Sequence, residues 1–223
     1  MTHSALIVSG AGRYADPWHA YDATSARIEA VLTDHGFRVD TSEDVEGSLA
    51  RLDNGTELLV VNAGISTWDS PEDASDRAAR QGLLRFLGRG GPVLAMHSSA
   101  STLPTVPEWE GIIGCRWVEG TTMHPTIGIG HIGVHPERHS IVAQSADFDI
   151  WDERYSYLRV MGDLVPLASH EHGGLKHPLL WARRYGRSRV VYDALGHDER
   201  SYDSGDHVAI IGRAARWLVE GLP

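Results

Sequence analysis

Short apolar runs alternate with segments of helical periodicity through the first half of the chain, and this alternation restricts the fold more than any other feature. Buried strands are expected at residues 5–9, 37–40, 57–62 and 92–96. Strands that alternate with helices build parallel sheets, because a parallel pair needs a long crossover connection. We therefore predict an α/β fold with a mostly parallel central sheet and crossover helices.

Capping residues mark the expected helix ends. Asp22 is expected to cap the first helix, and Ser70-Pro71 to open the next one with a cap and a first-turn proline. Asp206 and Gly221 are expected to bound a closing helix whose apolar residues share one face.

The second half of the chain is less regular. The elements expected there are a short helix near 109–113 and strands at 127–134, 164–168, 179–183 and 189–195. No linker divides the chain, so we treat residues 1–223 as a single domain.

The composition excludes several classes of protein. The single cysteine, Cys115, precludes an internal disulfide, and its apolar setting favours a buried filler over a nucleophile. A net charge of −10 disfavours nucleic-acid partners. No basic leader is present and no apolar run approaches the roughly 20 residues of a membrane span, so we expect a cytoplasmic protein without membrane partners.

Chemically useful residues follow several of the predicted strands. In an open α/β sheet, ligands bind beyond the carboxyl ends of the strands. The segments expected there are Gly10–Tyr14, Asn62–Gly64, His97-Ser98 and Gly196–Asp198. The first lacks the GxGxxG spacing, and no phosphate-binding GxxxxGK[ST] loop occurs, so no nucleotide cofactor is expected.

Five segments in a fixed order carry a family resemblance. They are Leu94–Ser98, Trp117–Gly120 leading to Met123–Pro125, Asp152–Tyr155, Arg189–Tyr192 and Ala194–Asp198. Over nearly the whole chain this pattern resembles the trehalose-utilisation (ThuA-like) family. The resemblance implies a flavodoxin-like, class I glutamine amidotransferase-like three-layer sandwich. It also implies carbohydrate catabolism, with trehalose or a related disaccharide, in native or keto form, as the substrate class.

The same resemblance argues against amide transfer. The amidotransferase relatives carry a cysteine at the sharp turn after the fourth strand, where this sequence has His97. Without a thiolate at that turn, glutaminase chemistry of that kind is excluded.

We expect four residues to converge on one site: His97, His124, Glu153 and His197. Three imidazoles and a carboxylate suit Zn²⁺ or another divalent metal, which could activate a water molecule. The alternative is a metal-free site in which His97 and Glu153 act as base and acid and His197 relays protons.

Other side chains could line the same site. Those expected to bind substrate are Tyr14, Trp18, His19, Asn62, Trp68, Ser98, Tyr155 and Asp198. Asp152 is expected to orient an imidazole, and His131 is an alternate for the histidine cluster. His170-Glu171-His172 is an H-x-H pattern that can bind metal, but it precedes two glycines and is interpreted as a solvated turn.

From the residues and the resemblance together we predict hydrolytic or lyase-type cleavage of a disaccharide or keto-sugar. Two alternatives stay open: a non-catalytic sugar-binding or regulatory module, and a sugar isomerase or epimerase that uses the same His/Glu pair. The expected partner is a small-molecule sugar. A sheet edge or the irregular 104–145 segment could support a homodimer.

Overall fold

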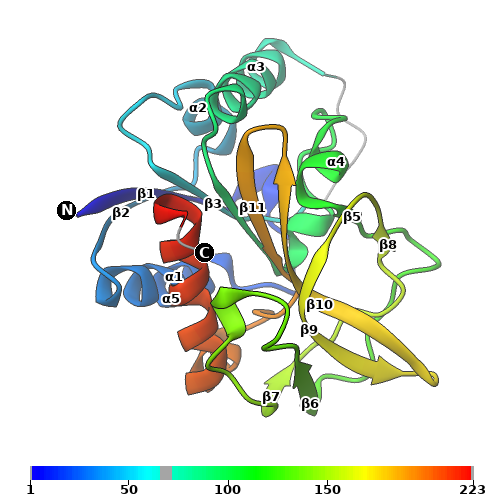
Figure 1. The fold of residues 1–223 in the computed structure, drawn as a ribbon. Helices are drawn as coiled ribbons and strands as arrows, with labels where there is room; N and C mark the ends of the chain where they lie inside the picture. The colour runs from blue at the N-terminus through cyan, green and yellow to red at the C-terminus, as the bar shows by residue number, and fades with distance from the viewer. Residues whose placement is uncertain (1, 66–71, 222–223) are drawn as a thin grey trace.

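The computed structural model describes residues 2–65 and 72–221, which build a mixed α/β fold around a large sheet (Figure 1). Within these residues the sheet has nine strands in the order β2-β1-β3-β4-β11-β10-β9-β6-β7. Their bounds are β1 His3–Ser9, β2 Phe37–Ser42, β3 Leu58–Asn62, β4 Val93–Met96, β6 Gly128–Val134, β7 Phe148–Asp152, β9 Val165–His172, β10 Leu175–Tyr185 and β11 Ser188–Asp193. The strands from β2 to β11 pair in parallel, and β10, β9, β6 and β7 extend the sheet with antiparallel pairs.

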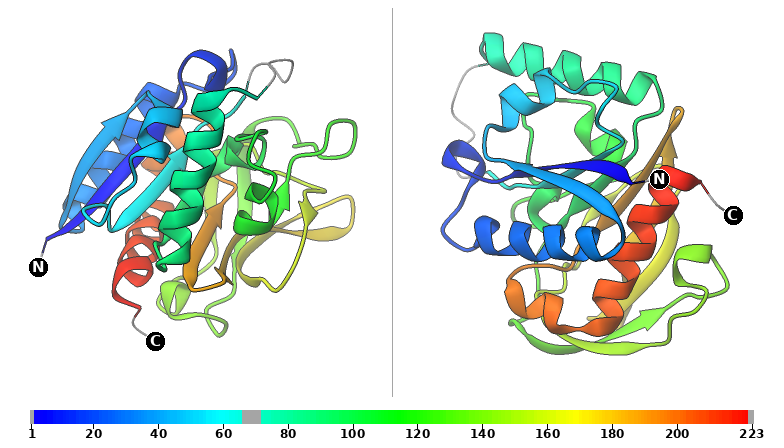
Figure 2. Two further views of the ribbon diagram at one scale, coloured as in Figure 1. Left: turned by 90° about the horizontal axis from the view of Figure 1, so that it is seen from above. Right: turned by 90° about the vertical axis from the view of Figure 1, so that its left-hand side faces the viewer.

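Helices cover both faces of the sheet, which confirms the predicted fold class. Helices α1 (Tyr21–Asp34) and α5 (Gly205–Glu220) lie on one face, and α2 (Val45–Ala50) and α3 (Ala74–Gly88) lie on the other (Figure 2). The smaller elements are η1 Gly12–Tyr14, η2 His97–Ala100, α4 Trp109–Ile113, β5 Cys115–Arg116, η3 Ser140–Val142, β8 Arg159–Val160 and η4 Glu199–Asp203. Strands β5 and β8 form a separate two-stranded sheet.

The central strands are apolar on both sides because both of their faces are covered. Every residue of β3 and β4 is buried. Continuous apolar runs, rather than alternating ones, are expected for parallel strands between two helical layers. This is why the alternation of runs and helices in the sequence predicted these strands correctly.

Two of the predicted helix caps are wrong by a few residues. Asp22 lies within the first turn of α1, which follows Ala20 without a side-chain cap. Asp206 likewise lies in the first turn of α5, whose cap is Ser204, with its hydroxyl accepting from the backbone N–H of His207. A first-turn carboxylate is favoured by the helix dipole, so the sequence alone does not distinguish it from a cap.

Helix α3 begins with a reciprocal capping arrangement. The Asp73 carboxylate accepts from the backbone N–H groups of Ser75 and Asp76, and Asp76 accepts from the N–H of Asp73. The predicted opening at Ser70-Pro71 lies outside the described residues.

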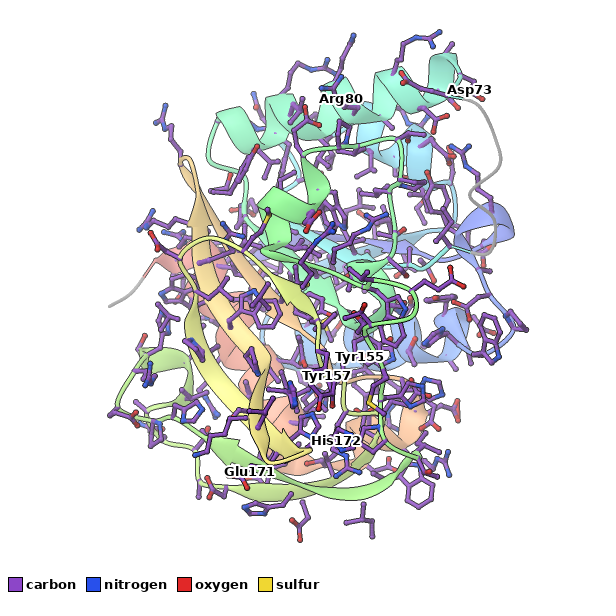
Figure 3. The ribbon with its side chains drawn as sticks, turned by 90° about the vertical axis from the view of Figure 1, so that its right-hand side faces the viewer. Asp73, Arg80, Tyr155, Tyr157, Glu171 and His172 are labelled. Carbon is purple, nitrogen blue, oxygen red and sulfur yellow. The ribbon has the colours of Figure 1, made fainter. Side chains whose placement is uncertain are left out.

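The His170–His172 segment is the end of β9, so its interpretation as a solvated turn is wrong. His170 is only 3% exposed, and its Nε2 lies 3.2 Å from the carbonyl oxygen of Tyr155 and 3.1 Å from Oγ of Ser156. Tyr155 and Tyr157 lie near this end of β9, where His172 is also found (Figure 3). The buried histidine therefore anchors the chain segment that follows β7.

Helices α2 and α3 approach closely at a glycine. A Cβ added to Gly82 of α3 would overlap the carbonyl oxygen of Leu49 and lie 2.8 Å from Cα of Ala50, both in α2. The short α2 was missed in the sequence, because six residues are too few to show a helical period. Its contact with α3 depends on the absence of a side chain at Gly82.

We predict opposite effects for two glycine-to-alanine substitutions in α3. Gly82→Ala should lower the free energy of unfolding by about 2 kcal/mol, because the clash outweighs a gain in helix propensity of about 1 kcal/mol. Gly88→Ala, with open space around the exposed glycine, should raise it by roughly 0.5 kcal/mol. Urea unfolding measures both. An equal gain at Gly82 would contradict the close packing of α2 and α3.

We also predict a pH dependence of stability that comes from His170. Burial lowers the pKa of His170 to about 4. Between pH 6.5 and 4 the unfolded chain therefore binds a proton that the folded chain does not, so stability falls as pH falls through this range. Allowing for partial solvent screening, the loss is about 2 kcal/mol at pH 4.

The variant His170→Gln keeps a donor near the Tyr155 carbonyl but does not titrate. Urea unfolding of both proteins at pH 7 and pH 4.5 should show a smaller loss of stability for the variant. The same loss in both proteins would show that other groups cause it.

Candidate functional site

Four loops meet at the carboxyl ends of the parallel strands. They follow β1, β4, β7 and β11, and they span residues 10–20, 97–98, 153–155 and 194–198. The loop after β7 reaches this place from the antiparallel half of the sheet. The site therefore combines both halves of the fold.

His97 occupies a strained turn directly after β4. Its backbone φ is +37°, in the left-handed region that favours glycine. The Tyr192 hydroxyl donates to the His97 carbonyl oxygen at 2.8 Å, and His97 Nδ1 donates to the Ala194 carbonyl oxygen at 2.7 Å. The ring is 1% exposed, so these bonds hold a buried imidazole with Nε2 directed at the site.

Glu153 lies among three imidazoles, as the sequence predicted. Its Oε2 is 3.2 Å from His197 Nδ1 and 3.6 Å from His97 Nε2, and its Oε1 is 3.4 Å from His124 Nε2. Burial by itself raises the pKa of Glu153, but the His197 and His97 imidazoles hold it well below its usual range. The carboxylate is thus ionised at neutral pH.

His197 is the reciprocal partner of Glu153. Burial alone would lower its pKa, but contact with Glu153 raises the pKa above the ordinary histidine value. Its Nδ1 is buried and makes no well-aligned hydrogen bond within the described residues. The pair can therefore hold or transfer a proton between an imidazole nitrogen and a carboxylate oxygen.

His19 completes the cluster, although the sequence predicted it only as a substrate-binding residue. One ligand atom from each of His19, His97, Glu153 and His197 lies within 4.8 Å of the others. Burial lowers the pKa of His19. His19 Nδ1 donates to Asp16 Oδ1 at 2.7 Å, and the buried Nε2 has no hydrogen-bond partner among the described residues.

Asp16 and Tyr21 are site residues that the sequence reasoning missed. Asp16 accepts from the His19 ring and from the backbone N–H groups of Trp18 and His19. The Tyr21 hydroxyl donates to Asp16 Oδ2 at 2.8 Å and lies 2.9 Å from Ser98 Oγ. The signal was a carboxylate three residues before a histidine in the loop after the first strand.

Asp152 has a different supporting role from the one expected. Its buried carboxylate accepts from the backbone N–H groups of Gly196 at 2.8 Å, His197 at 3.2 Å and Glu153 at 2.8 Å. It orients the loop that carries His197 rather than an imidazole ring. Burial raises the pKa of Asp152.

Tyr155 contacts the catalytic candidates directly. Its hydroxyl donates to His97 Nε2 at 2.8 Å, and its ring packs edge-on against Trp117 with 4.7 Å between centroids. Burial raises the pKa of Tyr155 well above its usual value. The hydroxyl is therefore a neutral donor.

Several predicted residues lie at the edge of the cluster. His124 contacts the cluster through Oε1 of Glu153, and its side chain is 36% exposed. Trp18 is 73% exposed next to His19, where its ring is free to meet a ligand. Asp198 caps η4 and pairs with Arg200.

Other predicted residues do not face the cluster. Tyr14 is part of the hydrophobic core. Asn62 donates to Thr24 and Ser25 at 2.9 Å and so ties β3 to α1. Ser98 is likewise buried beneath the site, and His131 is 67% exposed on β6, where it pairs with two aspartates. Trp68 lies outside the described residues.

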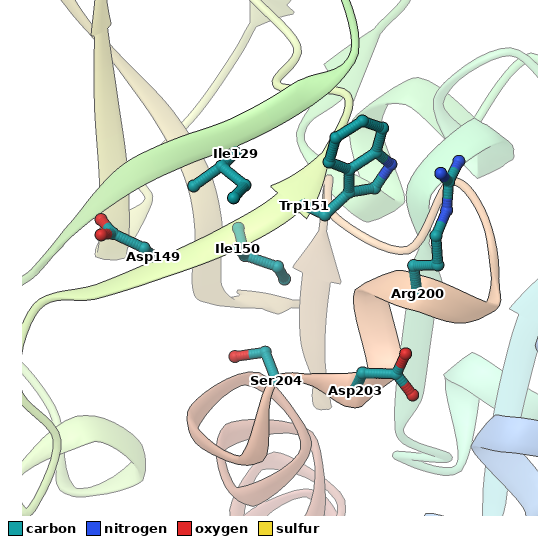
Figure 4. A pocket seen from close by; sticks show the side chains of 7 residues that line it. All are labelled: Ile129, Asp149, Ile150, Trp151, Arg200, Asp203 and Ser204. Carbon is teal, nitrogen blue, oxygen red and sulfur yellow. The ribbon is translucent and has the colours of Figure 1, made fainter.

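A separate pocket of about 420 Å³ lies beside β7 and η4 (Figure 4). Its lining residues are Ile129, Asp149, Ile150, Trp151, Arg200, Asp203 and Ser204. The Arg200 guanidinium stacks 4.5 Å over the Trp151 ring and pairs with Asp198. With its cation engaged and with no imidazole in its lining, this pocket is a weaker candidate site than the histidine cluster.

Solved structures with the same fold include ThuA-like proteins. The chain is similar to a ThuA-like protein from Parabacteroides merdae (18% identity, 99% of this chain and 91% of that chain, TM-score 0.77). It is also similar to one from Bacteroides uniformis (18% identity, 97% and 91%, TM-score 0.74). A glutamine amidotransferase from Thermotoga maritima matches at 12% identity over 97% and 92% of the chains, with a TM-score of 0.55. At these identities the similarity shows the fold.

The α/β fold is amidotransferase-like, and the turn after β4 carries His97. Cys115 is fully buried in β5, and burial raises the pKa of its thiol. The trehalose-utilisation (ThuA) family matches residues 4–218, and the chain belongs to this family. Membership implies involvement in trehalose utilisation. No protein of curated function matches the sequence significantly.

No helix in residues 2–65 and 72–221 combines the length and apolar character needed to cross a membrane.

The strained turn at His97 gives a testable prediction. His97→Ala and His97→Gly both remove the imidazole, but only glycine adopts a positive φ without steric cost. We expect His97→Gly to have a free energy of unfolding about 1 kcal/mol higher than that of His97→Ala. Thermal or urea unfolding of the two variants measures this difference. A less stable glycine variant would show that the turn is not strained.

Proposed function

We propose that this protein is an enzyme of sugar catabolism that cleaves a disaccharide or keto-sugar derivative of the trehalose type, by hydrolysis or by elimination. The supporting observation is the position of the Glu153 carboxylate, 3.2 Å from His197 and 3.6 Å from His97. Family membership supports the substrate class. The Zn²⁺ or other divalent ion expected from the sequence belongs to the proposal developed below.

Both reactions need a proton acceptor and a proton donor close together. In hydrolysis, water oxygen bonds to the anomeric carbon, the glycosidic C–O bond breaks, and the leaving oxygen takes a proton. In elimination, a base takes the proton from the carbon next to the keto group, and the glycosidic oxygen leaves with a proton. In a metal-free site, Glu153 with His97 would accept the proton, and His197, whose Nδ1 lies 3.2 Å from Glu153 Oε2, would donate one.

Neutral donors and aromatic rings near the cluster support a sugar as substrate. The Tyr155 hydroxyl, 2.8 Å from His97 Nε2, is a neutral donor that could also serve a sugar hydroxyl. The exposed Trp18 ring beside His19 offers an apolar face to a pyranose ring. We propose that Tyr155 and Trp18 bind the substrate.

The small-molecule sugar partner and the homodimer expected from the sequence also remain predictions.

The test is an NMR assay of the full-length protein with trehalose and with trehalose oxidised to a ketone on one ring. We expect two monosaccharide-derived products from at least one of them. Glu153→Gln, which is nearly isosteric but neutral, should lower the rate by at least roughly 100-fold. The control His131→Ala, at an exposed histidine on β6, should leave the rate unchanged.

Other outcomes would contradict this proposal. New NMR signals from a product with the same mass as the substrate would show an isomerase or epimerase. Saturable binding without turnover would show a sugar-binding module. Full activity of Glu153→Gln would remove the carboxylate from the reaction.

A further inference from the structure

Two buried imidazole nitrogens are left without aligned hydrogen bonds at the centre of the site. They are Nε2 of His19 and Nδ1 of His197, within the described residues. A buried polar atom without a partner is costly, so its retention needs an explanation. We propose that His19, His97, Glu153 and His197 together bind a divalent transition-metal ion of the Zn²⁺ type. The argument for metal binding does not depend on the proposed function. Only the use of the ion in sugar cleavage rests on it.

The spacing of the four side chains fits a metal ion better than it fits hydrogen bonds among them. Bonds of about 2.0–2.1 Å from Zn²⁺ to four tetrahedral ligands place the ligand atoms about 3.3–3.4 Å apart. Glu153 Oε2 lies 3.2 Å from His197 Nδ1 and 3.6 Å from His97 Nε2, and all four ligand atoms lie within 4.8 Å of one another. A small contraction would bring them to coordination distance.

The imidazoles are oriented by bonds on their far sides. His19 Nδ1 donates to the Asp16 carboxylate, which is itself held by Tyr21. His97 Nδ1 donates to the Ala194 carbonyl. Each bond fixes the tautomer and leaves the Nε2 lone pair directed inward. A carboxylate or carbonyl behind a histidine ligand is a recurring feature of metal sites.

The rings meet at their edges. The ring centroid of His19 lies 5.1 Å from that of His97 and 4.8 Å from that of His197. Both interplanar angles are near 65°. In this edge-to-face arrangement one ring nitrogen of each histidine lies within 4.8 Å of the others and of a Glu153 oxygen. Three nitrogens and one carboxylate oxygen favour Zn²⁺ and its neighbours over Mg²⁺ or Ca²⁺, which prefer oxygen ligands.

His124, which the sequence reasoning included among the ligands, lies outside this set. It contacts Oε1 of Glu153 rather than Oε2, and its Nδ1 lies 2.9 Å from the Pro125 carbonyl oxygen. The structure thus replaces His124 by His19. It leaves His124 at the rim of the site, in contact with Glu153 Oε1.

The test measures the affinity of the chelator-stripped full-length protein for Zn²⁺, by competition with a chromophoric chelator and without substrate. We expect one Zn²⁺ per chain in the wild type. His19→Ala should weaken binding by on the order of 100-fold, and Asp16→Asn by about 10-fold to 100-fold. The matched controls His124→Ala and His131→Ala should bind like the wild type. Tyr155→Phe should also bind at least as tightly, because it only removes the donor that occupies His97 Nε2.

Circular dichroism and Co²⁺ absorption make each outcome decisive. Folded His19→Ala that lacks the visible bands of four-coordinate Co²⁺ supports the site, and Asp16→Asn gives the same information if His19→Ala does not fold. Absence of stoichiometric Zn²⁺ in the wild type would overturn the proposal. So would wild-type affinity in folded His19→Ala, or a loss in His124→Ala as large as in His19→Ala.

The same experiments separate this proposal from the proposed function. Zn²⁺ binding without sugar turnover would retain the metal site and reject sugar cleavage. Turnover by a protein that binds no metal would retain sugar cleavage and reject the metal site.

Discussion

The buried carboxylate of Asp152 connects the two halves of the molecule, and the geometry of the site depends on it. Asp152 ends β7, an edge strand of the antiparallel half, yet it accepts N–H groups of Gly196 and His197 from the loop after β11. Charged side chains are seldom fully buried unless several donors satisfy them, and Asp152 is satisfied by three backbone donors. This contact sets the position of His197 relative to Glu153, the residue next to Asp152.

The strained backbone at His97 also helps to set the geometry of the site. His97 has a left-handed backbone directly after β4, and its hydrogen bonds with Tyr192 and the Ala194 carbonyl maintain this conformation. Strained backbone persists only where the surroundings over-determine it, and such positions concentrate at functional sites. In the ThuA chain this turn presents a histidine.

Much of the fold could be predicted because it follows from local patterns. Strands β3 and β4 are short apolar runs between helical segments, and burial on both faces makes such runs continuous. Elements without a local pattern were missed. Helix α2 is too short to show a period, β7 alternates only over five residues, and the caps of α1 and α5 were confused with acids in the first turn.

The sequence by itself determined that His97 and His197 follow parallel strands, and parallel strands deliver their carboxyl ends to one edge of a sheet. It also supplied Glu153 through the family pattern. Only the tertiary structure decided that His19, with Asp16 behind it, meets them and that His124 stays at the rim. The reason is physical: His19 and Glu153 come from loops on strands far apart in the sheet order. The distance between such loops depends on the twist and curl of the whole sheet, which no local run of residues encodes.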